Sequence, residues 1–183
     1  MQHPLKIDYF LRMIGEDGDN QLSPFNWSTW QPNMLSSLVF ICKNNEVLLI
    51  KKKTGLGAGK INAPGGKIEK GESAESAAVR EVMEEVRLEV SDLKKMGTLK
   101  FQFLNGDKLA LHCTVFKTST FSGDPEETIE AKPFWCDFKN VPYKDMWADD
   151  VIWLPGVLDD KRFKGKFVFD SDEMLFSNVQ WAN

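Results

Sequence analysis

The segment from residue 65 to residue 86, GGKIEKGESAESAAVREVMEEV, constrains this chain more than any other part of its sequence. Two glycines open it, and the remainder predicts a helix with Ser73 as its N-cap. At about 100° per residue, Glu81, Glu84 and Glu85 share one side of that helix. Like charges at this spacing repel one another, so a positive partner is expected. A bound divalent cation would be such a partner, and a solvated acidic face is the structural alternative.

The other side of this predicted helix is apolar, and Val79, Val82 and Val86 are expected to pack there against a sheet. Glu75 lies near the positive end of the helix dipole. Mg²⁺ is a hard cation that prefers carboxylate and phosphate oxygens as ligands. Three carboxylates beside a glycine loop therefore indicate a metal ion that is bound together with a polyphosphate.

Length and charge limit the class of protein. A chain of 183 residues with net charge -4 and a pI near 5.3 suits one soluble domain. The net negative charge does not provide the excess of basic residues that binding to nucleic acid requires. No apolar run approaches the roughly 18 residues of a membrane span. The first 20 residues lack the core of a signal peptide. We therefore expect a cytoplasmic monomer without nucleic-acid or membrane partners.

Three cysteines, Cys42, Cys113 and Cys136, are widely spaced in apolar stretches and show no CxxC pattern. This spacing argues against a zinc site or a disulfide framework. Buried, reduced thiols are the expectation.

The rest of the chain predicts strands with few helices. Asn44-Asn45 and Asn105-Gly106 each join two apolar runs, as in a β-hairpin. The stretch at 132–138 predicts a strand, 149–163 a short helix with Pro155 tolerable only near its first turn, and 166–181 a final strand pair. Because the elements do not alternate regularly, the sequence favours an α+β fold, an α/β/α sandwich with a mixed sheet.

Residues 1–33 form an N-terminal extension with turn formers and three aromatic residues, Phe25, Trp27 and Trp30. Disordered tails are usually poor in aromatics, so part of this extension is expected to pack on the domain at 34–183, with the remainder flexible.

The acidic segment closely resembles the Nudix box, Gx₅Ex₇REUxEExGU, where U is aliphatic. The match starts at Gly66, runs through Glu72 and Arg80-Glu81, and departs only at Arg87, where the family has glycine. The resemblance implies a Nudix hydrolase domain at 34–183 that cleaves nucleoside diphosphate derivatives with Mg²⁺, for which Mn²⁺ can substitute.

The same resemblance implies roles for individual residues. Glu81, Glu84 and Glu85 would hold the metal, and Arg80 would orient them. Glu72 would support them from behind, and the Gly65 carbonyl and Glu130 would be further ligands. Which carboxylate acts as the general base is left open by the resemblance.

Outside the box, KKKTGLGAGKINAPGGKI and VPYKDMWADDVIWLPGVLDDKRFKGKFVF resemble the eukaryotic-type 8-oxo-dGTP diphosphatases, which hydrolyse oxidised purine nucleoside triphosphates. This likeness implies that Trp147 stacks on the purine, while Asn62, Asp149 and Asp150 read its edge. Adjacent buried carboxylates raise each other's pKa, so one can stay protonated and donate a hydrogen bond. A core tryptophan beside a helix-capping aspartate is the structural alternative.

Weaker matches and departures complete the prediction. Phe101 and Phe103 alternate on one strand, and a pocket wall and plain core are equally compatible with them. Ser37 and Lys52 match polar pocket positions. Leu56, Pro64 and Ala148 depart from the subfamily pattern and are expected to change the shape of the pocket.

The expected function is Mg²⁺-dependent hydrolysis of 8-oxo-dGTP, and of 2-hydroxy-dATP, to the monophosphate and pyrophosphate, which sanitises the nucleotide pool. Two alternatives stay open at this point: a hydrolase of ADP-ribose or another nucleoside diphosphate derivative, and a nucleotide-sensing module without catalysis. The intact box carboxylates argue against the sensing module.

Overall fold

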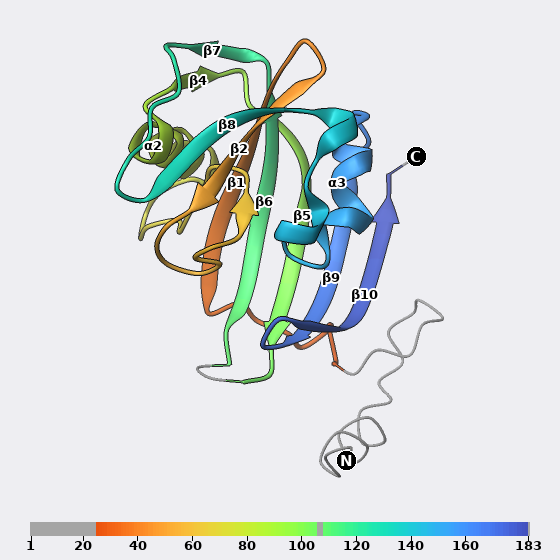
Figure 1. Ribbon diagram of the computed structural model, residues 1–183. Coiled ribbons are helices and arrows are strands. Elements are labelled where there is room, and N and C mark those ends of the chain that lie inside the picture. The colour runs from red at the N-terminus through yellow and green to blue at the C-terminus, as the bar shows by residue number, and fades with distance from the viewer. Residues whose placement is uncertain (1–24, 106–107, 183) are drawn as a thin grey trace.

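A computed structural model describes residues 25–105 and 108–182, and one large mixed sheet dominates it (Figure 1). The strand order is β10-β9-β5-β6-β1-β2-β3, with β8 paired to β2. These strands are β1 (Met34–Lys43), β2 (Glu46–Lys52), β3 (Ile61–Asn62), β5 (Lys94–Phe103), β6 (Ala110–Thr118), β8 (Ala131–Asp137), β9 (Phe163–Asp170) and β10 (Glu173–Trp181). A small separate sheet consists of β4 (Glu89–Ser91) and β7 (Thr120–Ser122).

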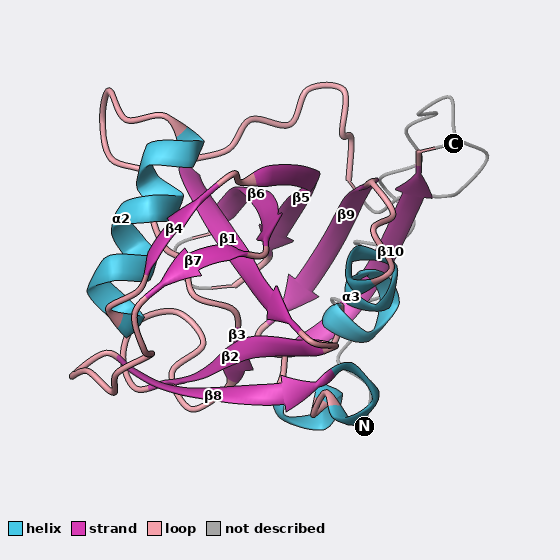
Figure 2. Cartoon of the chain, turned by 90° about the horizontal axis from the view of Figure 1, so that it is seen from above, coloured by secondary structure: helices cyan, strands magenta, loops and turns pink. Residues whose placement is uncertain are grey.

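The helices α2 (Ala74–Val86) and α3 (Asp150–Leu158) pack on opposite sides of the sheet (Figure 2). Successive residues of a strand face opposite sides. Accordingly, Val39 of β1 contributes to the cluster that contains Val82 of α2, whereas Phe40 contributes to the cluster that contains Trp153 of α3. The predicted α/β/α sandwich with a mixed sheet is confirmed.

The first predicted hairpin is present, and β5 pairs antiparallel with β6 as the second requires, although Gly106 of its turn lies outside the described residues. Asn44 and Asn45 have φ of 48° and 65°, as a tight turn with left-handed residues requires, and join β1 to β2. Only two residue pairs of this hairpin are in register before the strands diverge. Beyond that point β1 pairs in parallel with β6, and β6 pairs with β5 in the second hairpin. The β1–β6 pairing is a long-range contact that local turn signals did not reveal.

The helix predicted at 149–163 is shorter in the structure. It ends at Leu158, because Asp160 takes a left-handed φ of 63° and β9 already begins at Phe163. Pro155 lies in the second turn of α3, so the expectation that it would be tolerated only in the first turn is wrong. Its missing N–H removes one hydrogen bond to Val151, which is 52% exposed.

Part of residues 25–33 packs on the sheet over the neighbouring strands β9, β5 and β6. Trp27 and Trp30 are buried against Ala110 and Val168, and the indole N–H of Trp30 donates to Gln102 at 3.0 Å. Residues 1–24, which include the segment predicted to lack a signal-peptide core, lie outside the described residues. The boundary at residue 34 and the flexibility of the extension stay predictions.

All three cysteines are free thiols. Cys42 and Cys113 are buried as expected, whereas Cys136 is only half-buried, so the expectation of burial is wrong there. Its strand, β8, lies at the edge of the sheet and pairs only with β2. Within the described ranges, neither helix is long and apolar enough to cross a membrane.

Candidate active site

Helix α2 carries the acidic residues of the site. It begins as predicted, with the Ser73 side chain accepting a hydrogen bond from the Ser76 amide at 3.0 Å. Val82 and Val86 are fully buried, but Val79 is 38% exposed, so its predicted place in the core is wrong. Ala78 is buried instead of Val79, because the buried side of the helix is rotated towards the preceding residue relative to the predicted side.

The three glutamates differ sharply in exposure, although they share one arc of α2. The side chain of Glu85 is 2% exposed, that of Glu81 13% and that of Glu84 50%. Glu85 lies near the middle of the buried side of the helix, and Glu84 lies at its edge. Burial raises the pKa of both Glu81 and Glu85, against the opposing attraction of nearby cations.

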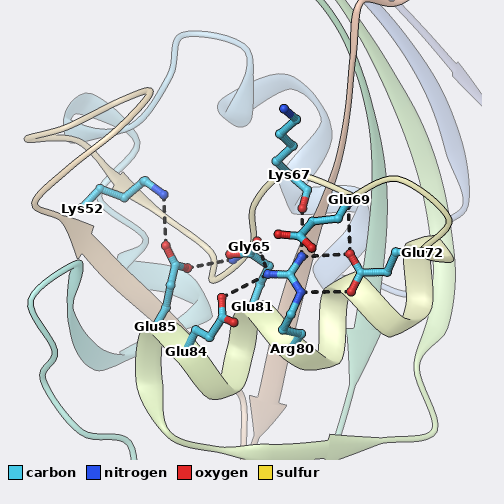
Figure 3. Close-up of polar contacts among 9 residues, drawn as sticks. All are labelled: Lys52, Gly65, Lys67, Glu69, Glu72, Arg80, Glu81, Glu84 and Glu85. Atoms are coloured by element: carbon cyan, nitrogen blue, oxygen red, sulfur yellow. Dashed lines mark hydrogen bonds and ion pairs between the residues drawn. The ribbon is translucent and has the colours of Figure 1, made fainter.

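The guanidinium of Arg80 is the hub of the acidic cluster (Figure 3). Two of its nitrogens donate to Glu72, Nε at 3.0 Å and Nη2 at 2.9 Å, while Nη1 donates to Glu81 at 2.8 Å and to Glu84 at 3.0 Å. A fifth bond joins Nη2 to the Lys67 carbonyl at 3.0 Å. Hydrogen bonding to Glu72 raises the pKa of Arg80 and lowers that of Glu72. Arg80 thus fixes carboxylates on both sides of itself.

Two donors outside α2 hold Glu85. Lys52 Nζ lies 3.0 Å from Oε1, and the Gly65 amide donates to Oε2 at 2.9 Å. The glycine pair permits this packing because a Cβ on Gly66 would collide with the Glu81 carboxylate, and one on Gly65 would collide with the Ser37 carbonyl.

The donors present fit a hard divalent cation. The carbonyls of Pro64 and Gly66 accept from the amides of Val39 and Ser37, whereas the described residues provide no donor for the Gly65 carbonyl between them. That carbonyl and the box carboxylates are the oxygen ligands that Mg²⁺ prefers. Among the described residues, no three acidic, His or Cys side chains converge on one point. Arg80 binds Glu81, and Lys52 binds Glu85.

A cavity of about 330 Å³ lies beside this cluster. Twelve of the predicted site residues line it: Ser37, Lys52, Asn62, Gly65, Glu81, Glu85, Phe101, Phe103, Glu130, Trp147, Asp149 and Asp150. The other three predicted residues, Glu72, Arg80 and Glu84, are outside its lining and contact the cluster from behind. The fold therefore brings together the predicted metal-binding and base-binding positions.

Aromatic rings build the deep end of the cavity. The Trp147 indole meets Phe103 and Phe169 edge-on, at ring-centroid distances of 5.9 Å and 5.7 Å. The ammonium of Lys60 lies 4.8 Å from the centroid of the Trp147 ring. Phe101 and Phe103 pack in the core and also line the cavity, so both predicted roles, core residue and pocket wall, apply to them.

Two aspartates enter the same end of the cavity from the start of α3. Asp149 Oδ2 accepts from the Trp153 indole at 2.8 Å, and Asp150 Oδ2 accepts from the Trp147 amide at 3.0 Å. Burial raises the pKa of Asp149 to about 6, and burial with the Asp149 charge raises that of Asp150 well above its usual range. Asp149 Oδ1 and the hydroxyl of Ser37 are buried without a hydrogen-bond partner among the described residues.

Sequence reasoning missed several residues that line the cavity. Leu38, Leu111 and Phe169 contribute apolar walls, and Lys67 lies at the rim. The alternation of Phe167 and Phe169 on β9 was a usable signal, since it repeats the spacing of Phe101 and Phe103. Leu38 and Leu111 carry no local signal, because only the pairing of β1 with β6 brings them to the cavity.

The departures from the resemblance have clear structural settings. Arg87 ends α2 in the left-handed conformation, with φ 62°, and its amide donates to the Met83 carbonyl at 3.1 Å. The box geometry is therefore kept without glycine. Leu56 is half-exposed at the cavity rim, Pro64 is buried below it, and Ala148 is exposed beside Trp147.

A family model described as NUDIX domain matches residues 32–157, and the chain belongs to this family. Two similar relatives are named oxidized purine nucleoside triphosphate hydrolase. That of Danio rerio is 41% identical over 77% of this chain and 90% of its own length, and that of Mus musculus is 37% identical over 78% and 91%. Among solved structures, a MutT protein of Bacillus halodurans superposes with a TM-score of 0.72 at 25% identity, covering 80% of this chain and 97% of that one. The family expected from the sequence is confirmed.

Proposed function

We propose that this protein hydrolyses oxidised purine nucleoside triphosphates, 8-oxo-dGTP first among them, to the monophosphate and pyrophosphate with Mg²⁺. The names of the two relatives support this substrate class. The structural observation that carries the proposal is a single cavity whose lining includes the buried, unpartnered Ser37 hydroxyl and Asp149 Oδ1 together with Glu81 and Glu85. Buried polar atoms without a partner are costly, so they mark where a ligand's polar edge belongs.

The deep end of the cavity binds the base in this proposal. The Trp147 indole offers a flat stacking surface, worth ~1–3 kcal/mol by analogy with base–aromatic stacking. Because burial disfavours two adjacent charges, the Asp149–Asp150 pair holds a proton near neutrality and presents both a donor and an acceptor. Asn62, which also lines the cavity, adds an amide. This pattern complements an oxidised purine edge, which differs from a normal one in its donors and acceptors.

In this proposal the phosphates and the metal ion bind at the mouth of the cavity. When bound, a divalent ion supplies charge neutralisation and activation of water. Glu81, Glu84, Glu85, Glu130 and the Gly65 carbonyl would hold it. Arg80 binds Glu81 and Glu84, and Lys52 binds Glu85, so these carboxylates would exchange part of those contacts for the ion. Water then attacks one phosphorus of the bridge between the α- and β-phosphates. The bridging oxygen leaves with the other fragment and a proton is released, which gives the nucleoside monophosphate and pyrophosphate.

Pyrophosphate release from 8-oxo-dGTP, 2-hydroxy-dATP and dGTP, measured beside AMP release from ADP-ribose, tests the proposal. We expect strong preference for an oxidised triphosphate and dependence on Mg²⁺. Preference for ADP-ribose would overturn the base site and leave the metal site standing. Binding without any turnover would indicate the sensing module.

A further inference from the structure

The loop between β7 and β8 is hydrogen-bonded to the C-terminal end of α2. The Glu126 amide donates to the Val86 carbonyl at 2.9 Å, and the Thr128 hydroxyl donates to the Glu85 carbonyl at 2.9 Å. The last carbonyls of a helix have no partner within the helix. The loop therefore satisfies the backbone of the same residue, Glu85, whose side chain lines the active-site cavity.

The Thr128 hydroxyl uses its full hydrogen-bonding capacity. A hydroxyl has one donor and two acceptor positions. Besides donating to Glu85, Oγ1 of Thr128 accepts from the amides of Glu130 and Ala131, both at 3.2 Å. One oxygen atom thus links the backbone of Glu85 to the backbone of Glu130, two residues that lie 45 positions apart in sequence and face the same cavity.

Lys53 fixes the loop from the side of β2. Its amide donates to the Glu130 carbonyl at 2.8 Å, and its ammonium contacts the Thr128 carbonyl at 2.6 Å and Glu127 at 2.7 Å. The preceding residue, Lys52, binds the Glu85 carboxylate. The position of Glu130 relative to Glu85 is consequently set by ties to two separate elements.

We propose that Thr128 is a positioning residue for the metal site: its hydroxyl holds the Glu130 carboxylate at the correct place relative to Glu85. This inference rests on the proposed function. Glu130 is exposed on a loop, where its side chain would sample many orientations if the backbone were free. Fixing that backbone lowers the entropy lost when the carboxylate binds an ion, so metal affinity depends on a hydroxyl that touches neither ion nor substrate.

Thr128→Val tests the inference, because valine keeps the shape and removes the hydroxyl. Mn²⁺ binding to the nucleotide-free protein, followed by the EPR signal of free Mn²⁺, provides a readout independent of turnover. We expect roughly 10-fold weaker binding, the scale seen when groups that orient metal ligands are removed. Thr128→Ser restores the hydroxyl and is expected to restore binding. If Thr128→Val does not fold, Thr128→Ala takes its place.

Thr118→Val is the matched control. The Thr118 hydroxyl also donates to a backbone carbonyl, that of Ser91 at 2.7 Å, and accepts from a backbone amide, that of Thr120 at 2.9 Å, but it is not part of the cavity lining. It should bind Mn²⁺ as the wild type does. Equal weakening in both variants would mean that the effect is general destabilisation, and would overturn the inference.

A double-mutant cycle with Glu130→Gln identifies the residue through which Thr128 acts. In the Glu130→Gln background, Thr128→Val should have little further effect on Mn²⁺ binding. An undiminished 10-fold loss there would show that Thr128 does not act through Glu130. Turnover of 8-oxo-dGTP by the wild type is measured in parallel. If the variants bind Mn²⁺ as expected but the wild type does not hydrolyse 8-oxo-dGTP, the proposed substrate is overturned and the role of Thr128 stands.

Discussion

The Lys52 ammonium lies 3.0 Å from the Glu85 carboxylate, which is almost completely buried. The two residues come from β2 and α2 and are 33 positions apart in sequence. A buried carboxylate requires a compensating charge, and Lys52 provides it where a divalent ion is proposed to bind. Together with Arg80, which binds Glu81 and Glu84, this pair balances the negative charge of the acidic helix.

Glu85→Gln should reduce turnover of 8-oxo-dGTP by about 100-fold or more, the scale for loss of a group that acts on the reacting centre. The amide keeps the size of the side chain but cannot neutralise a metal ion. Steady-state pyrophosphate release measures the effect, with circular dichroism to establish that the fold is retained. Glu75→Gln, on the exposed first turn of the same helix, is the control. Full activity in Glu85→Gln would remove this residue from the mechanism.

Asp149→Asn should change base selectivity far more than metal dependence. The Asp149 side chain faces the base end of the cavity, and an amide offers a fixed donor where the carboxyl pair can exchange donor and acceptor. The ratio of kcat/KM for 8-oxo-dGTP to that for dGTP measures selectivity, and a Mg²⁺ titration serves as the internal comparison. An unchanged ratio would contradict the assignment of Asp149 to the base edge.

The stability of the protein should depend on pH through Asp149. Its pKa rises from the model-compound value of 3.8 to about 6 on folding, so ionisation costs stability as the pH rises from about 4 to 6 and the cost is complete above that range. Asp149→Asn removes this cost. Urea denaturation should show a gain on the order of 1–3 kcal/mol at pH 7 that shrinks towards pH 4. An equal gain at both pH values would contradict the pKa shift; the exposed Asp145→Asn is the control.

Arg87→Gly should raise the free energy of unfolding by roughly 0.5–1 kcal/mol, because a left-handed φ strains any residue with a Cβ and glycine escapes that strain at some cost in entropy. Chemical denaturation measures this gain. Turnover should not change, since the Arg87 side chain is outside the cavity lining. Arg162→Gly, at an exposed position without a left-handed backbone, should give no such gain.

Trp30→Ala should lower the free energy of unfolding by about 3–5 kcal/mol, as for other buried aromatic residues. Trp30 is 7% exposed, and its indole donates to the buried Gln102. Thermal and urea denaturation measure the loss, with the partly exposed Trp181→Ala for comparison. Substrate KM should stay unchanged below the melting temperature. A negligible loss of stability would show that residues 25–33 contribute little to the fold.

The sequence by itself determined the features that depend on local spacing. The Nudix box, the Ser73 cap, the Asn44-Asn45 turn and the shared arc of Glu81, Glu84 and Glu85 all follow from residue types at short, fixed intervals. The placement of Val79 and the end of α3 were predicted wrongly. Both features depend on how a helix packs against the sheet. That packing decided which residues of α2 are buried and where α3 ends.

Only the tertiary structure decided which distant residues meet. The parallel pairing of β1 with β6 brings Met34 opposite Leu111 and Ser36 opposite Cys113, and thereby forms one wall of the cavity. The same architecture brings Lys52 to Glu85 and Thr128 to the end of α2. Such contacts join segments tens of residues apart, so their free energy depends on the packed sheet and leaves no local pattern in the chain.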